Sequence, residues 1–509
     1  MYKMKEVVND EISKSIDENI KYIKELLEGN SDMVFREFLI GDKKAFIMYI
    51  DGMADKDLLN DYVLESLMLE SEKLGNISDI KNRISNKRYE SNDKCNVNDI
   101  KNKILTVTDV SEKDKLSKAI DLVLSGDTLL LIEGMDKAYV IATRLWPVRG
   151  VGEPESETTI KGSRDGFTET IRFNTALVRR RIKDTRLKIK SKTLGVRSKT
   201  DMAIIYIEDI VNQDVLNNIY DRLEKIDIDA ILGSGYIEHL IEDGKWSLFP
   251  TTRSTERPDV VASALYEGKV AILVDNSPFA IIVPTTLPSL FQSPDDYYEK
   301  WIHSSIIRII RLFSIIISII LPSMYVAVTS YHSDIIPTKL AYFIAASREG
   351  VPFPAYMEAL IMEFSLAFLM ESIIRLPKPI GATIGIVGGL IIGQAAVSAG
   401  IVSPIMIIIV SITTITSFTA PSYDASLSFR IIRFLLIIAA SFLGLYGIIL
   451  GLIVLLIHLV RLKSFGIPYL SPMVNPSISD FKDMYIRAPI RFFKKRPDYM
   501  KTRDKIRQR

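Results

Sequence analysis

Residues 379–423 read PIGATIGIVGGLIIGQAAVSAGIVSPIMIIIVSITTITSFTAPSY and contain no Asp, Glu, Lys, Arg or His. As one α-helix, a run of this length would extend about 67 Å, at a rise of about 1.5 Å per residue. The hydrocarbon core of a bilayer is about 30 Å thick, so the run is long enough for two crossings. The sequence therefore predicts two membrane-spanning helices that turn near residues 399–404.

Two further uncharged runs extend this pattern. Residues 312–331 form the first, with a kink expected at Pro322, and residues 434–457 form the second, which is followed by His458 and Arg461. Each run is long enough to cross a membrane once. Residues 301–462 are therefore predicted to be a helical membrane domain of about four spans.

A fifth apolar segment, residues 355–376, is interrupted by charged residues, including Glu358, Glu363 and Glu371. Each charge at a bilayer centre costs about 2.5 to 3.5 kcal/mol on insertion scales. The segment is therefore expected to be an amphipathic or half-buried helix, lying in the membrane interface or against other helices. Charged residues inside a membrane are also default candidates for function, although Glu371 could form a plain surface pair with Arg375, four residues later.

The distribution of charge predicts how the chain is oriented. The basic tail, residues 463–509, should remain in the cytoplasm under the positive-inside rule. An even number of spans then places both termini on the cytoplasmic side. Four spans have one cost, because Arg430 and Arg433 then fall on the external side.

The remainder of the chain is rich in charge and predicts a water-soluble part. Overall, 64 Lys and Arg residues balance 62 Asp and Glu residues, for a formal net charge of +2. The start of the chain lacks the apolar core of a signal peptide, and Cys95, the single cysteine, excludes an intramolecular disulfide. The first half is therefore expected to lie in the cytoplasm.

Alternating apolar patterns and turn residues divide the soluble part into two mixed α/β subdomains, so the fold class is α/β followed by transmembrane helices. The expected order is a helical extension (1–31), the first subdomain (32–146), a linker (147–164) and the second subdomain (165–300). Strand pairs are expected at 34–40 with 45–50, and at 270–275 with 278–284. Ser111 is expected to cap a helix, and residues 71–98 are expected to form a surface excursion.

Residues 161–183, KGSRDGFTETIRFNTALVRRRIK, predict a tight turn at Gly162 and Gly166, followed by a helix from about Phe167. Asp165 or Thr168 is the expected cap, and the turn could hold an anion at the N-terminus of the helix. The basic stretch from residue 178 to residue 199 could face lipid headgroups, an acidic partner or solvent, whereas nucleic acid is not expected. The candidate contacts with lipid or a second subunit are Arg164, Asp165, Arg179, Arg180 and Arg181.

Four glycines repeat at every fourth position of the first predicted span of the long run: Gly381, Gly385, Gly389 and Gly393. Such a stripe lets another helix approach closely. It could form a seam between helices or subunits, line a narrow conduit, or reflect ordinary packing within one subunit. In the next span, Thr413 and Thr414 could line a watery path or bond to carbonyls of their own helix.

Enzyme and metal motifs are absent from the sequence. The chain lacks the P-loop, the nucleophile elbow and the zinc-protease motif, and its four histidines are far apart. Neither catalysis nor a cofactor is therefore expected.

Several segments between residues 142 and 497 resemble the A subunit of GerA-type spore germinant receptors. The departures, Ser163, Thr251 and Asn276, fall in turns or loops. The segments that carry the resemblance are GSRDGFTET, NTALVRRRIKD, FPTTRSTERPD, EGKVAILVDNSPF, QSPDDYY, LPSMYVA, SREGVPFPAYMEAL, RLPKPIGATIGIVGGLIIGQAAVSAGIVSP and SFGIPYLSPMVNP.

The resemblance implies a subunit of the inner membrane of a bacterial spore. The resemblance also implies that the protein acts together with a permease-like B subunit and a lipoprotein C subunit. It further implies that copies of the protein form a homo-oligomeric ring that conducts ions when a germinant binds. Two alternatives remain: a scaffold that does not conduct ions, such as an A-like protein linked to dipicolinate release, and a secondary transporter.

Overall fold

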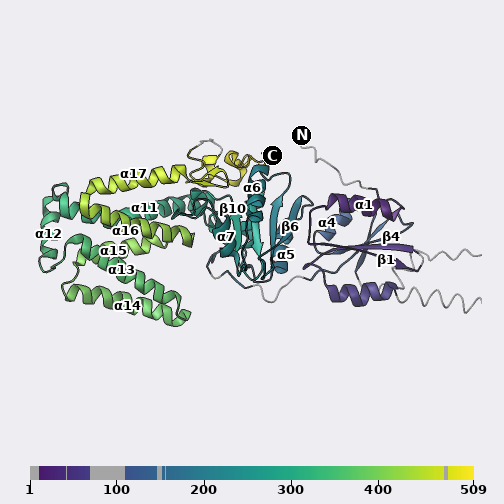
Figure 1. Cartoon of the computed structure of the whole chain (residues 1–509), viewed down its shortest axis with the longest axis horizontal. Helices are drawn as coiled ribbons and strands as arrows, with labels where there is room; N and C mark the ends of the chain where they lie inside the picture. The colour runs from purple at the N-terminus through teal and green to yellow at the C-terminus, as the bar shows by residue number, and fades with distance from the viewer. Residues whose placement is uncertain are drawn as a thin grey trace, which may run out of the picture.

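The computed structural model describes residues 11–41, 43–68, 109–145, 152–154, 156–474 and 480–508. Figure 1 shows one α/β unit at one end of the molecule, a second α/β unit in the middle and a group of long helices at the other end. The expected excursion at residues 71–98 and the single cysteine lie outside the described residues.

The first unit is an antiparallel sheet with strand order β1-β2-β4-β5-β3. Helices α1 (Ile16–Leu26) and α4 (Leu116–Val123) cover one face, and a π-helical turn, Leu58–Leu64, packs on the other. Because α1 places its apolar side chains in the core, it is an integral part of this unit. The strands are β1 (Met33–Ile40), β2 (Lys43–Ile50), β3 (Val110–Lys113), β4 (Thr128–Ile132) and β5 (Ala138–Ile141).

The first predicted hairpin is confirmed, because β1 pairs with β2 along its whole length. Gly41 in its turn has φ 59°, a conformation that glycine adopts without steric cost. The predicted helix cap at Ser111 is wrong. This residue lies in β3 and pairs with Val140, and the helix begins five residues later at Leu116.

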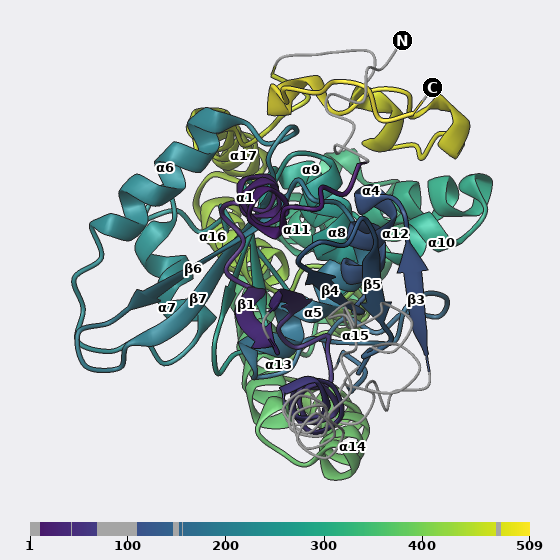
Figure 2. The same ribbon diagram turned by 90° about the vertical axis from the view of Figure 1, so that its right-hand side faces the viewer.

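The second unit is an antiparallel sheet with strand order β6-β7-β9-β10-β8. Helices α5 (Ile171–Arg181) and α8 (Pro258–Tyr266) cover one face, whereas α6 (Gln213–Glu224) and α7 (Ser234–Ile241) cover the other (Figure 2). Its strands are β6 (Leu187–Leu194), β7 (Thr200–Ile207), β8 (Arg253–Thr255), β9 (Val270–Val274) and β10 (Ala280–Val283).

The two units share one topology. In both sheets the strands, taken in chain order, are arranged first, second, fourth, fifth and third. In both units one helix precedes the first strand, another links the third and fourth strands, and these two helices lie on the same face. The soluble part is therefore a duplicated arrangement.

The predicted start of the arginine-rich helix is wrong by four residues. Helix α5 begins at Ile171, and Phe167 precedes it as extended chain that packs in the core. Asp275, in the turn between β9 and β10, accepts a hydrogen bond from the first helical N–H, that of Ile171, at 3.0 Å. Neither Asp165 nor Thr168 caps the helix.

The second predicted strand pair is also confirmed, because β9 pairs with β10. Asn276, in the turn between these strands, has φ 62°.

The helical end of the molecule is built mainly from α11 (Trp301–Tyr331) and α13 to α17. Helix α11 continues through Pro322, and a short 3₁₀ turn (Ser333–Ile335) leads to α12 (Thr338–Arg348) at the far end of the molecule in Figure 1. The others are α13 (Ala355–Ile374), α14 (Lys378–Ser398), α15 (Pro404–Ser417), α16 (Tyr423–Leu443) and α17 (Leu445–Arg461).

Two of these helices, α11 and α16, are long and apolar enough to cross a membrane. Much of the surface of the bundle is also apolar, with Phe442 76% and Ile386 73% exposed. Exposed apolar patches of this kind mark surfaces that contact a membrane or another protein. The segment at residues 355–376 was expected to lie either in the membrane interface or against other helices. Its helix, α13, packs against α11, α14, α15 and α16 of the bundle.

The single span predicted at residues 434–457 is wrong. Gly444 separates α16 from α17, and its φ of 57° and ψ of −136° reverse the chain. Figure 1 shows α16 and α17 side by side as a helical hairpin. One uncharged run therefore supplies parts of two helices.

The tail returns to the second unit. Short helices α9 (Leu287–Leu290) and α10 (Asp295–Tyr298) lead out of that unit, and strands β11 (Lys463–Ser464) and β12 (Ile467–Pro468) bring the chain back. Apolar side chains at the β11–β12 turn join the core beneath α6 and α7. The remaining ordered turns of the tail are 3₁₀ turns at Asp480–Asp483, Ile490–Phe492 and Asp498–Met500.

Candidate functional site in the helical bundle

The first charged centre in the bundle is formed by Glu358 on α13, which is completely buried. One carboxylate oxygen accepts a hydrogen bond from Arg348 at 3.1 Å, and the other accepts one from the backbone N–H of Ser403 at 2.8 Å. A buried carboxylate is stable when it is paired and hydrogen-bonded, and here both conditions are met. Glu358 therefore ties α13 to the ends of α12 and α15.

The second charged centre joins Glu363 on α13 to Arg433 on α16, with 2.9 Å between the carboxylate and the guanidinium. Arg433 also donates to the backbone carbonyl of Ser318 on α11 at 3.2 Å. Both side chains are almost fully buried, yet one oxygen of Glu363 and the Nε of Arg433 have no hydrogen-bond partner. The pair therefore links three helices but is incompletely satisfied.

The third predicted glutamate, Glu371, has a different environment. It pairs with Arg375 at 2.6 Å, and both side chains are exposed. This arrangement matches the plain surface pair that the spacing of four residues allowed.

The glycine stripe of α14 has two different environments. A side chain at Gly381 or Gly385 would meet Ile373 of α13, and one at Gly393 would meet Ile407 of α15. Gly389 has open space instead, with no atom within 4 Å of the position of an added Cβ. Most of the stripe thus packs within the chain, and its centre is open.

Thr413 and Thr414 bond back to their own helix. Their hydroxyls donate to the carbonyls of Ile409 at 2.7 Å and Val410 at 2.8 Å. Thr413 is completely buried, and Thr414 is partly buried. The more ordinary of the two alternatives is therefore the one observed in this structure.

A charged cluster at the junction of the second unit and the bundle was not predicted. Asp296 on α10 accepts hydrogen bonds from Arg308 at 2.8 Å and Arg311 at 3.1 Å, both on the first turns of α11. Arg308 also pairs with Asp483 of the tail at 2.7 Å, and the hydroxyl of Tyr297 donates to the same carboxylate. The cluster joins two consecutive helices, α10 and α11, to a tail residue 175 positions after Arg308. Two arginines placed three residues apart just before an uncharged run were its signal.

The residues of the arginine-rich segment lie in distinct environments. Arg179 is completely buried and donates to Asp32 of the first unit, at 3.0 Å from Nε and 2.9 Å from Nη2. It also bonds Asn30 and the carbonyl of Leu187. This side chain therefore holds the two α/β units together and is not accessible to lipid or to a second subunit.

The neighbouring charges remain nearer the surface. Arg181 pairs with Asp165 at 2.5 Å, Arg164 forms an exposed pair with Glu153 at 3.3 Å, and Arg180 is exposed. The first N–H of α5 already bonds Asp275, so the suggested anion site is occupied by a side chain of this protein.

The described residues contain no group of three or more His, Cys, Asp or Glu side chains arranged to hold a metal ion. The candidate site is thus a set of ion pairs and small residues within a bundle of apolar helices. This bundle is joined to two α/β units that share one topology. This combination defines a membrane-associated protein with a large soluble part.

Comparison with known proteins identifies the family. Residues 21–499 match the model of the Bacillus/Clostridium GerA spore germination proteins. The chain is 40% identical to spore germination protein GerLA of Bacillus cereus, with 97% of each chain covered. It is 41% identical to the uncharacterized membrane protein YfkQ of Bacillus subtilis (strain 168), over 96% of this chain and 91% of that protein.

A solved structure also matches, the N-terminal domain of the A subunit of the Bacillus megaterium spore germinant receptor GerK3. It is 35% identical, covers 53% of this chain and 95% of that domain, and has a TM-score of 0.37. The chain belongs to the GerA spore germination protein family.

Proposed function

We propose that this protein is a membrane subunit of a nutrient germinant receptor in the inner membrane of bacterial spores. In this proposal it acts with a permease-like B subunit and a lipoprotein C subunit, and several copies form an ion channel that opens when a germinant binds. Membership of the family supports the role in germination. Two helices long enough to cross a membrane and an apolar surface support the location.

The open position at Gly389 carries the proposal of a homo-oligomer. Within one chain, no atom is near enough to explain why this position is a glycine. Its neighbours on α14 are apolar and exposed, with Leu390 66% and Ile386 73% exposed. A second copy packed on this face would give Gly389 the close helix contact that small residues allow in membranes.

Gly389→Leu tests this contact, because an added Cβ at this position meets no other atom of the chain. We expect normal folding of the monomer but a smaller oligomer and reduced nutrient-triggered cation release, because the added side chain meets the neighbouring copy. The measurements are the mass of the complex in detergent and ion release from spores. Ala395→Leu is the matched control, since it places the same leucine side chain on a different, exposed face of α14. Unchanged mass and release in the Gly389 variant would contradict the proposal.

A scaffold that does not conduct ions is the second candidate. It is favoured by the hydroxyls of Thr413 and Thr414, which donate to carbonyls of their own helix. Purified protein in planar bilayers separates the two candidates. Reproducible currents that Gly389→Leu reduces support the channel, whereas the absence of current with an intact oligomer supports the scaffold.

A further inference from the structure

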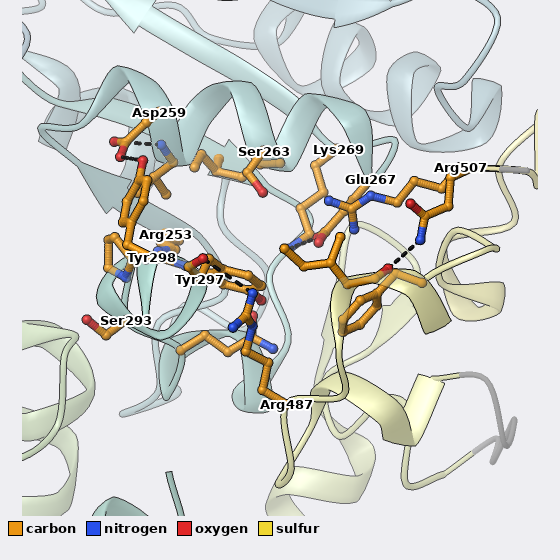
Figure 3. A pocket seen from close by; sticks show the side chains of 18 residues that line it. Arg253, Asp259, Ser263, Glu267, Lys269, Ser293, Tyr297, Tyr298, Arg487 and Arg507 are labelled. Atoms are coloured by element: carbon orange, nitrogen blue, oxygen red, sulfur yellow. Dashed lines mark hydrogen bonds and ion pairs between the residues drawn. The ribbon is translucent and has the colours of Figure 1, made fainter. Parts of the chain in front are cut away.

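A cavity of about 300 Å³ lies between the second α/β unit and the tail. Helix α8 and the ends of β9 and β10 form one side, α10 forms another, and tail residues close the cavity (Figure 3). Binding sites for small molecules generally occupy about 300 to 1,000 Å³. The cavity is therefore at the lower end of the range for a small organic ligand.

Both carboxylates of the cavity already have cationic partners. Asp259 pairs with Arg257 at 2.8 Å and accepts a hydrogen bond from the hydroxyl of Tyr298 at 2.6 Å. Burial, together with this hydrogen bond, raises the pKa of Tyr298 to about 12, so the hydroxyl remains a donor at neutral pH. Glu267 pairs with Lys269 at 3.4 Å.

Three guanidinium groups of the cavity have no carboxylate partner among the described residues: Arg253, Arg487 and Arg507. Arg253 donates to the carbonyl of Ser289, and Arg487 donates to the carbonyls of Glu299 and Tyr297. Figure 3 shows Arg507 reaching from the tail toward the side formed by Glu267 and Lys269. Arg487 and Arg507 therefore add positive charge without an ion-pair partner among these residues, whereas Arg253 lies near the buried carboxylate of Glu157.

Arg487 gives the strongest indication of an anion. It is 2% exposed, and its Nε has no hydrogen-bond partner. A buried donor without a partner costs about 1 to 3 kcal/mol, and more when it is charged. Guanidinium groups attract carboxylates and phosphates, so the buried charge of Arg487 favours an anion in the adjoining cavity.

The rest of the lining is apolar and selects among anions. Val260, Ala264 and Ile282 come from the second unit, and Ile490 and Phe493 come from the tail. An inorganic ion would leave these side chains without contacts, whereas an apolar group would bury them.

We propose that this cavity binds a small organic carboxylate with a compact apolar body. Its carboxylate faces the guanidinium groups, and its body lies between α8 and Phe493. Because the lining comes from both the second unit and the tail, the bound molecule holds the end of the chain against the soluble part. The proposal does not depend on whether the helices conduct ions.

Titration calorimetry of the full chain in lipid nanodiscs tests the site, with benzoate as the probe. Benzamide, which has the same shape without the charge, and inorganic phosphate, which has the charge without the apolar body, are the comparison probes. We expect saturable binding of benzoate with a dissociation constant of about 1 mM or tighter, and weaker binding of both other probes.

Two variants locate the binding. Arg507→Gln should weaken benzoate binding at least about tenfold, the loss expected for one charge-assisted hydrogen bond. Ser263→Leu, which fills the cavity from the surface of α8, should abolish it. Arg503→Gln is the matched control, because this exposed arginine lies on the same tail outside the cavity.

Unchanged thermal unfolding of the variants shows that the fold is intact. The proposal is overturned by any of three results: benzoate gives no saturable binding, benzamide or phosphate binds as tightly as benzoate, or Arg507→Gln behaves like Arg503→Gln.

Discussion

At the scale of single residues, the Glu363–Arg433 pair is a buried ion pair with a large expected effect on stability. Removing one partner of a buried pair leaves an unbalanced charge and typically costs about 3 to 5 kcal/mol. We therefore predict that Glu363→Gln strongly lowers the thermal stability of the bundle, because Arg433 then remains buried without a counter-charge. The measurement is thermal unfolding in detergent.

Two controls distinguish this electrostatic cost from a general sensitivity of α13. The double variant Glu363→Met with Arg433→Met should recover most of the loss, since apolar residues of similar size often replace a buried pair without a penalty. Glu371→Gln, in the exposed pair, should change stability by less than about 0.5 kcal/mol. A single Glu363→Gln variant as stable as the unchanged protein would contradict the prediction.

The arginine-rich segment shows how far residue types alone can locate a function. Three consecutive arginines predict a basic surface, yet Arg179 is fully buried and binds Asp32, 147 positions earlier in the chain. The helical periodicity of α5 could show that position 179 faces inward. It could not show that a carboxylate of the other α/β unit lies there, because that contact is set by the packing of the two units.

At the scale of elements, alternation of apolar residues correctly predicted both hairpins, whereas an uncharged run gave the wrong number of helices. Hydropathy reports whether a segment avoids water, and both sides of a helical hairpin do so. The break between α16 and α17 depends on one glycine within the apolar run, where glycines also occur in continuous helices. The backbone dihedral angles of Gly444 show where the helix breaks, whereas the residue types of the apolar run do not.

Gly444→Ala should therefore destabilise the α16–α17 hairpin. The glycine has φ 57° and ψ −136°, a conformation that costs other residues about 1 to 3 kcal/mol. An added Cβ would also lie 2.8 Å from the ring of His332. We expect a clear fall in the thermal unfolding temperature of the full chain in detergent.

Gly350→Ala is the matched control for this change. Gly350 has no atom within 4 Å of an added Cβ and has no positive φ, so the same substitution should have little effect. An equal fall in both variants would show that the corner at Gly444 is not the sensitive element.

At the scale of the whole molecule, the structure gives a different account of the charges on α16. The hydroxyl of Ser428, near the start of this helix, donates to the carbonyl of Leu248 in the second unit. Arg430 and Arg433 therefore lie in the half of α16 that is nearer the soluble part. With the corner at Gly444, residues 434–457 no longer form one span, so these arginines no longer have to be external and their conflict with the positive-inside rule is removed.

The duplicated α/β arrangement is the largest feature that sequence reasoning missed. Matching strands of the two units, such as β1 and β6, read MVFREFLI and LKIKSKTL, so no repeat is visible in the letters. A sheet requires only apolar side chains on the covered faces, and many sequences meet that condition. The shared strand order of the two units is therefore evident only from the strand pairing in the structure.

Contacts between helix ends predict how the bundle passes through the membrane. The end of α15 contacts the start of α16 through Ser426 and Ser417, so α15 ends on the side of the second unit. Ser403, at the start of α15, bonds Glu358 near the start of α13, on the far side. Helix α14 must then begin, and α13 must end, on the side of the second unit. With α11 and α17, this gives six passes, and an even number places both termini on one side.

Cysteine labelling in bacterial cells tests this six-pass arrangement. In a Cys95→Ser background, we predict that Asp334→Cys, beyond α11, reacts with a membrane-impermeant maleimide in intact cells. Lys245→Cys, Ile374→Cys and Lys501→Cys should react only after the membrane is permeabilised, which also provides the control that each thiol is accessible. The decisive position is Ile374, because a helix α13 lying in the membrane interface would leave it on the same side as Asp334. Labelling of Ile374→Cys in intact cells would therefore reject six passes, and labelling of Lys501→Cys would reject a shared side for the termini.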